Sequence, residues 1–177
     1  MRVFAGIALD AKMKNALAQA ALEARKLFPG RYAPRDNYHC TLQFIGQADA
    51  AMVLAAEKAV REAAADSSPF LMSLTGLSFF RRPQDAVLFC GISESAALLE
   101  LARTVRERLS AVGFILEEAA FHPHITLARQ AKLNTTQLSM IPVVQESLLV
   151  EEITLFESRR VEEQLRYVPL LSCPLGK

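Results

Sequence analysis

Two tetrapeptides of this sequence place a threonine two positions after a histidine: HCTL, which begins at His39, and HITL, which begins at His124. Each lies in an apolar stretch that favours a β-strand, where residues i and i+2 point to the same face. His39 should therefore share a face with Thr41, and His124 with Thr126. The residues between and after them should turn toward the core.

Two imidazoles that face each other across a cleft can supply a general base and a general acid, because an unperturbed histidine titrates near ~6.5. Phosphoryl transfer to water needs this division of labour. One ring removes a proton from water and the other protonates the departing oxygen. Threonine hydroxyls can donate hydrogen bonds to the non-bridging phosphate oxygens. The scheme requires no metal ion, and neither tetrapeptide contains an acidic residue, which argues against a two-metal nuclease.

The segments that would position these motifs alternate between strand and helix patterns. The patterns predict strands at 2–9, 70–80, 86–92, 153–160 and 166–172 and two more beginning at His39 and His124, with helices at 11–27, 49–65 and from a Ser93 cap to Gly113. The two strands before and after the loop RRPQD form a plausible hairpin. This order favours an α+β domain with helices outside a mostly antiparallel sheet.

The two halves of the sequence repeat in register. A shift of 85 positions (124 − 39) carries one motif onto the other, and it also carries Phe4 to Phe89 and Gly6 to Gly91. A duplicated βαβ-like unit is the simplest explanation. We therefore expect residues 1–177 to form one domain of two pseudo-symmetric lobes, each supplying one motif (39–42 and 124–127), with the histidines converging across a groove.

Composition limits the functions that the repeat can serve. A net charge of +1 excludes the basic surface of a protein that tracks long duplexes, but it permits a small anionic ligand or a nucleic-acid end. The cysteines Cys40, Cys90 and Cys173 are odd in number and lack C-x-x-C spacing, which favours a reducing cytoplasm. No apolar run approaches the ~20 residues that span a bilayer, so we expect a cytoplasmic protein without membrane contact, and nothing demands more than a monomer.

The paired motifs resemble the H-x-T-x signatures of the two-histidine (2H) phosphoesterase superfamily. The segments NYHCTLQFIG and FHPHITLAR, the opening strand RVFAGIAL and the terminal RYVPL are most similar to the LigT-like RNA 2',3'-cyclic phosphodiesterases, also called 2'-5' RNA ligases. The resemblance extends over most of the chain. One H-x-T motif would be weak support, whereas two with this spacing are specific.

The resemblance implies a bilobal α+β fold with a central cleft and a metal-independent, cofactor-free hydrolysis of RNA 2',3'-cyclic phosphate ends to 2'-phosphates. It also implies that His39 protonates the 3' oxygen, that His124 activates water, and that Thr41 and Thr126 bind the phosphate. Run in reverse, the same site would join a cyclic end to a 5'-hydroxyl through a 2'-5' bond.

Two residues near the motifs depend on the strand geometry. Arg129 matches an arginine of the family pattern HPHITL-x-R, and its guanidinium would bind phosphate. Strict alternation from His124 places Arg129 on the opposite face, so a bulge or strand end is needed. The same count from His39 places Phe44 off the catalytic face and Cys40 in the core.

The remaining candidates lie outside the tetrapeptides. His122 is expected to have a structural or orienting role, and Arg81 and Arg82 of the loop RRPQD are possible RNA contacts. Three alternatives stay open: a related phosphodiesterase acting on 2'-5' oligoadenylate or ADP-ribose cyclic phosphate, a non-catalytic nucleotide-binding module, and a zinc hydrolase built on His122, His124 and His39.

Overall fold

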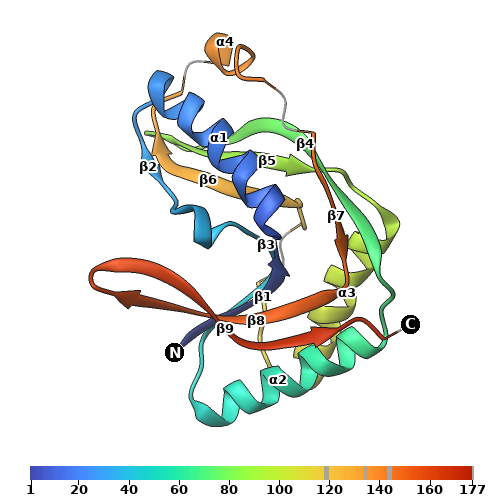
Figure 1. Ribbon diagram of the computed structural model, residues 1–177. Coiled ribbons are helices and arrows are strands. Elements are labelled where there is room, and N and C mark those ends of the chain that lie inside the picture. Colours follow the sequence, from blue (N-terminus) through green and yellow to red (C-terminus); the bar gives the residue numbers. More distant parts are fainter. Residues whose placement is uncertain (118–119, 134, 143–144, 177) are drawn as a thin grey trace.

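Two β-sheets carry the two motifs, one motif on each sheet (Figure 1). The computed structural model describes residues 1–117, 120–133, 135–142 and 145–176. The strand order is β3-β1-β8-β9 in the four-stranded sheet and β2-β6-β5-β4-β7 in the five-stranded sheet. All neighbouring strands are antiparallel. The motif strands β3 and β6 contact each other where the two sheets meet.

The four-stranded sheet has one apolar face covered by helices. Its strands are β1 (Arg2–Ala8), β3 (His39–Gln47), β8 (Glu152–Val161) and β9 (Gln164–Pro174), and the covering helices are α2 (Ala50–Ala65) and α3 (Ala96–Ala111). Val3, Ala5 and Ile7 alternate along β1 and are buried in the core. The opposite face of this sheet carries the His39 side of β3, because successive side chains of a strand point in opposite directions.

The five-stranded sheet consists of β2 (Arg31–Tyr32), β4 (Phe70–Arg81), β5 (Ala86–Ile92), β6 (His124–Ala131) and β7 (Ser147–Val150), with α1 (Ala11–Leu27) against β6. Figure 1 shows α1 crossing β5 and β6. Short helical turns occur at η1 (Arg35–Asn37) and α4 (Thr135–Leu138). Two of the long helices, α1 and α3, pack across the sheet boundary. Helix α1 follows a strand of the four-stranded sheet and contacts the other, whereas α3 follows β5 and contacts β3.

Side-chain caps fix where the long helices begin. Asp10 accepts a hydrogen bond from the backbone amide of Met13 at 2.7 Å, and Asp49 caps α2 in the same way. The prediction that Ser93 caps α3 is wrong, because Ser95 is the N-cap residue of this helix. Ser93 cannot begin the helix because its amide still donates to the carbonyl of Ser73, at 2.8 Å, as a continuation of the sheet.

The predicted α+β class with antiparallel sheets and outer helices is confirmed. Every predicted strand and long helix is present, whereas the short edge strands β2 and β7 had no signal in the sequence pattern. The relation of the two halves as pseudo-symmetric lobes of one domain stays a prediction. Within the described part of the chain, no helix combines the length and the apolar character needed to cross a membrane.

Candidate active site

His39 begins β3 with both ring nitrogens engaged. Its Nδ1 lies 2.7 Å from the carbonyl oxygen of Asn37, and its Nε2 lies 2.9 Å from the hydroxyl oxygen of Thr41. A carbonyl oxygen can only accept, so Nδ1 carries the proton in the neutral ring. Nε2 is then an acceptor for the Thr41 hydroxyl. The structure therefore confirms that His39 and Thr41 share a face, with Cys40 and Leu42 buried behind them.

His124 begins β6 in the same arrangement. Its Nδ1 donates to the carbonyl oxygen of His122 at 2.6 Å, so the neutral ring leaves Nε2 as its free acceptor. Thr126 is half-buried like His124, while Ile125 and Leu127 between and after them are fully buried. The predicted alternation is confirmed here too. His122 thus orients His124 through its backbone, and its side chain is exposed.

Aromatic rings hold both imidazoles in place. His39 packs against Phe4 and edge-on against Tyr167, with ring centroids 4.8 and 4.7 Å away. His124 packs edge-on against Phe80, at 5.0 Å, and against Phe89, at 5.3 Å. Phe4 and Phe89 are the residues that the 85-position shift brings together, so the repeat supplies one ring to each histidine.

The surroundings of both histidines favour their neutral form. Burial lowers the pKa of His39 to about 4, and the charges of His124, Arg129 and Lys14 act in the same direction. The carbonyl of Asn37 opposes this shift because it accepts a hydrogen bond from Nδ1. Burial also lowers the pKa of His124, again with a contribution from Arg129. The charge of Arg129 therefore lowers the pKa values of both histidine rings.

These shifts predict how the folded state responds to acid. The pKa of His39 is lower in the folded than in the unfolded chain, so the unfolded state binds the proton first. Stability should be complete above about pH 6.5 and should fall toward pH 4, with His39 contributing at most about 3 kcal/mol. Urea unfolding of the wild type and of His39→Gln across this range measures the effect. Parallel curves for the two proteins would contradict it.

Bulges in both motif strands change which face the later residues occupy. In β3, Gly6 pairs with Thr41 and Ala5 with Gln43, so Leu42 is the extra residue. Phe44 then pairs with Phe4, and the two rings lie 5.7 Å apart. Because Phe4 also packs on His39, the expectation that Phe44 lies off the catalytic face is wrong. The Phe44 side chain is 56% exposed on the histidine side of the sheet.

The bulge in β6 has the same effect on Arg129. Phe89 pairs with Thr126 and Leu88 with Ala128, so Leu127 is the extra residue. Ala128 therefore faces the buried side, and Arg129 turns to the side of His124. The sequence predicted that Arg129 needs a bulge to face the same side as His124, and this bulge is present. Burial raises the pKa of Tyr167, which packs on His39, and the charge of Arg129 opposes this shift.

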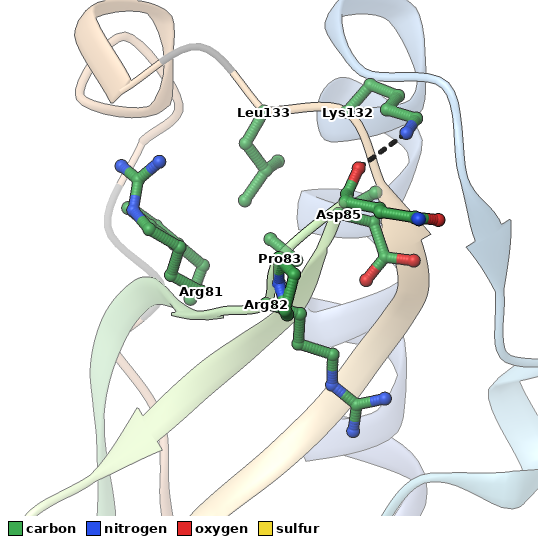
Figure 2. A pocket seen from close by; sticks show the side chains of 10 residues that line it. Arg81, Arg82, Pro83, Asp85, Lys132 and Leu133 are labelled. Carbon is green, nitrogen blue, oxygen red and sulfur yellow. Dashed lines mark hydrogen bonds between the residues drawn. The ribbon is translucent and has the colours of Figure 1, made fainter.

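Arg81 and Arg82 lie at the tip of the β4–β5 hairpin, beside a cavity of about 350 Å³ that Asp85 and Lys132 also line. Figure 2 shows the two arginine side chains leaving the hairpin in different directions. The Arg81 guanidinium lies 5.5 Å from the centroid of Phe79, whereas it is the neighbouring Phe80 that packs on His124. Because neighbouring side chains alternate, Arg81 lies on the face away from His124. An RNA contact by either arginine stays a prediction.

Cys40, the cysteine inside the first motif, has a clear position. Cys40 is fully buried, and burial raises the pKa of its thiol to about 12, so it is a core residue as expected. Among the residues that the structure describes, no three or more histidine, cysteine or acidic side chains gather closely enough to hold a metal ion.

No role was predicted from the sequence for two residues of the site, although Tyr167 lies in the segment RYVPL that resembles the family. Asn37 supplies the carbonyl that orients His39, and Tyr167 supplies a ring against it. The signal for Asn37 was available in the repeat, because the 85-position shift carries Asn37 to His122, whose carbonyl orients His124. Tyr167 comes from β9, far away in the sequence, and only the sheet order brings it to His39.

Comparison with known proteins agrees with this geometry. Residues 13–162 match the sequence model of the 2'-5' RNA ligase superfamily. The chain is 31% identical to an RNA 2',3'-cyclic phosphodiesterase of Geobacillus stearothermophilus, over 98% of this chain and 59% of that protein's own length. It is 29% identical to the RNA 2',3'-cyclic phosphodiesterase of Escherichia coli K12, over 96% and 93% of the two chains. The solved structure of Escherichia coli LigT complexed with 3'-AMP has a TM-score of 0.81 and 30% identity, over 99% of this chain and 98% of that chain.

Proposed function

Because this chain belongs to the 2'-5' RNA ligase superfamily, we propose that it is an RNA 2',3'-cyclic phosphodiesterase, which opens cyclic phosphate ends to 2'-phosphates without a metal ion. One observation carries the proposal. Each of two facing strands presents a histidine whose Nδ1 is held by a backbone carbonyl, which leaves its Nε2 for proton transfer. The named activity of the relatives and the 3'-AMP in the LigT complex support a nucleotide with a terminal phosphate as the substrate.

In the proposed reaction, water attacks the phosphorus of the cyclic phosphate. His124 removes a proton from the water as the new P–O bond forms. The bond between phosphorus and the 3' oxygen breaks, and His39 gives its Nε2 proton to that oxygen. The product has a 2'-phosphate and a free 3'-hydroxyl. Thr41, Thr126 and Arg129 donate hydrogen bonds to the non-bridging oxygens, where negative charge increases in the transition state.

The acid role of His39 depends on the bound phosphate. Burial lowers the pKa of His39 to about 4, so the ring is neutral at pH 7 and accepts from the Thr41 hydroxyl. An anionic phosphodiester beside the ring favours the imidazolium form. Once Nε2 is protonated it no longer accepts from Thr41. The hydroxyl is then free to donate to the phosphate at the moment when the acid is formed.

The test is incubation of EDTA-treated protein with the four nucleoside 2',3'-cyclic monophosphates and a short RNA with a 2',3'-cyclic phosphate end. We expect 2'-phosphate products at an unchanged rate in EDTA, resolved chromatographically from the 3' isomers. A 3'-phosphate product would contradict the assigned leaving oxygen. Loss of turnover in EDTA with recovery on adding Zn²⁺ would favour the zinc hydrolase. Absence of turnover in folded protein would favour another phosphodiester substrate, such as 2'-5' oligoadenylate or an ADP-ribose cyclic phosphate, or a binding module.

Ligation belongs to the same proposal. When a 5'-hydroxyl replaces water as the nucleophile, His124 removes its proton and His39 protonates the departing 3' oxygen, so the site joins a cyclic phosphate end to a 5'-hydroxyl through a 2'-5' bond with no ATP. Hydrolysis should dominate because water is in large excess over RNA ends. We further propose that the two motif-bearing halves act as lobes of one catalytic domain, since neither half contains both histidines.

A further inference from the structure

Asn37 connects the catalytic face to the edge strand β9 through three hydrogen bonds. Its side-chain Nδ2 donates to the carbonyl oxygen of Leu165 at 2.7 Å, and its Oδ1 accepts from the amide of Tyr167 at 3.4 Å. Its own carbonyl accepts from Nδ1 of His39 at 2.7 Å. The residue is only 6% exposed, one of two buried polar residues in the described part of the chain. A buried amide with both ends bonded has a defined orientation.

We propose that Asn37 is a positioning residue that keeps His39 in the tautomer with the proton on Nδ1, by fixing its own carbonyl against β9. This inference rests on the proposed function for the importance of His39. Without the side-chain bonds, the last residue of η1 would be free to rotate its peptide, and the carbonyl would leave the His39 ring. The proton could then move to Nε2, and the ring could no longer accept at the cleft.

The edge strand contributes in two ways at the same point. Leu165 and Tyr167 bind the Asn37 side chain through their backbone, and the Tyr167 ring lies edge-on 4.7 Å from His39. The orientation of the ring and the direction of its Nδ1 bond are therefore set by one short segment of β9. This explains how a strand that is last in the chain supports a histidine at position 39.

The second motif orients its histidine through the same backbone bond but without a buried side chain behind it, which provides a matched control. His122 occupies the position equivalent to Asn37 (37 + 85 = 122), and its carbonyl accepts from Nδ1 of His124. Its side chain is exposed. Removing the His122 side chain should therefore leave His124 in place, whereas removing the Asn37 side chain should release His39.

Asparagine is specifically suited to this position because it donates and accepts on one planar group. Asn37→Ala leaves the Leu165 carbonyl and the Tyr167 amide without this partner. Asn37→Asp keeps the size and the acceptor but loses the donor to Leu165. The new carboxylate would also oppose the positive charges that reach His39 from His124 and Arg129 on β6 and from Lys14 on α1. The Tyr167 phenol, the other titratable group against this ring, lies on β9.

The experiment combines nuclear magnetic resonance with kinetics. The chain has three histidines, so ¹⁵N-histidine labelling and long-range ¹H–¹⁵N correlation resolve the tautomer of each ring. In wild type we expect His39 with the proton on Nδ1. In Asn37→Ala we expect a mixture of tautomers at His39, no change at His124, and a loss of kcat of about ten- to a hundredfold with little change in KM. His122→Ala retains the carbonyl that orients His124, so we expect no change of tautomer at His39 or at His124.

Asn37→Asp keeps the test decisive if Asn37→Ala does not fold. We expect the alkaline limb of its pH profile of kcat to move to higher pH, because the added charge favours the imidazolium form of His39, the general acid, which then stays protonated to higher pH. An unchanged His39 tautomer in folded Asn37→Ala, or an unchanged profile in Asn37→Asp, would overturn the inference. The tautomer measurement needs no turnover, so its result stands even if the wild type hydrolyses none of the cyclic phosphates and the proposed function fails.

Discussion

Replacing either His39 or His124 with alanine lowers kcat on a nucleoside 2',3'-cyclic phosphate by about a thousandfold, within the range measured for losing a general acid or base. The reason is the position of Nε2. Both rings commit Nδ1 to a backbone carbonyl, so each has one nitrogen left for the substrate and no neighbour can replace it. Initial rates at saturating substrate measure the effect, and circular dichroism shows that both variants fold.

His122→Ala is the matched control for these two variants. The side chain is exposed, and within the described part of the chain the hydrogen bond between His122 and the second motif comes from the backbone carbonyl of His122, which alanine retains. We expect kcat within about threefold of wild type, as for surface changes that leave the reacting groups in place. Combining His39→Ala with His124→Ala should cost little more than either alone, because the two rings act as one unit. Equal losses at all three histidines would contradict the assignment.

Gly6→Ala destabilises the fold by about 2 kcal/mol, while its repeat partner Gly91→Ala costs less than about 1 kcal/mol. A Cβ on Gly6 would lie 2.7 Å from the carbonyl oxygen of Cys40, so the backbone of β3 must move. A Cβ on Gly91 would lie 2.4 Å from Oγ1 of Thr75, whose exposed side chain can rotate away. Its next contact, the carbonyl oxygen of Gly76, is 3.7 Å away.

Urea unfolding of both glycine variants at pH 7 measures the difference. Because Gly6 pairs directly with Thr41, the shift of β3 in Gly6→Ala should also disturb the first motif. We therefore expect its remaining folded fraction to turn over more slowly than wild type. Equal stability of the two alanine variants would show that the close approach of β1 and β3 relaxes without cost.

Alternation and helical periodicity were sufficient to predict the strands, the long helices and the shared face of each histidine–threonine pair. They failed where one residue interrupts the period. The extra residues Leu42 and Leu127 look like ordinary strand leucines, and only the pairing with β1 and β5 shows that they form bulges. The face of Phe44 was wrong for this reason, and the face of Arg129 could not be decided.

Contacts between segments that are far apart in the sequence could not be predicted from the sequence pattern either. Asn37 looks like one polar residue of a loop, and its importance depends on β9, more than a hundred positions later. Ser93 and Ser95 are equally good caps by composition, and the choice between them follows from a hydrogen bond to β4. Local sequence preferences do not contain this information, because it arises from which strands become neighbours.

The paired bulges make the surroundings of the two histidines chemically different. They bring Phe44 and Arg129 to the histidine side at positions that the 85-residue shift makes equivalent (44 + 85 = 129), so one wall has an exposed ring where the other has a guanidinium. Two identical walls would accept a phosphodiester in either orientation, and half of the encounters would place the leaving oxygen at the wrong histidine. A nucleotide has a flat, weakly polar end and an anionic end. On the proposed function, we expect the difference between these two side chains to set the orientation in which a nucleotide binds, and thereby which histidine acts as the acid and which as the base.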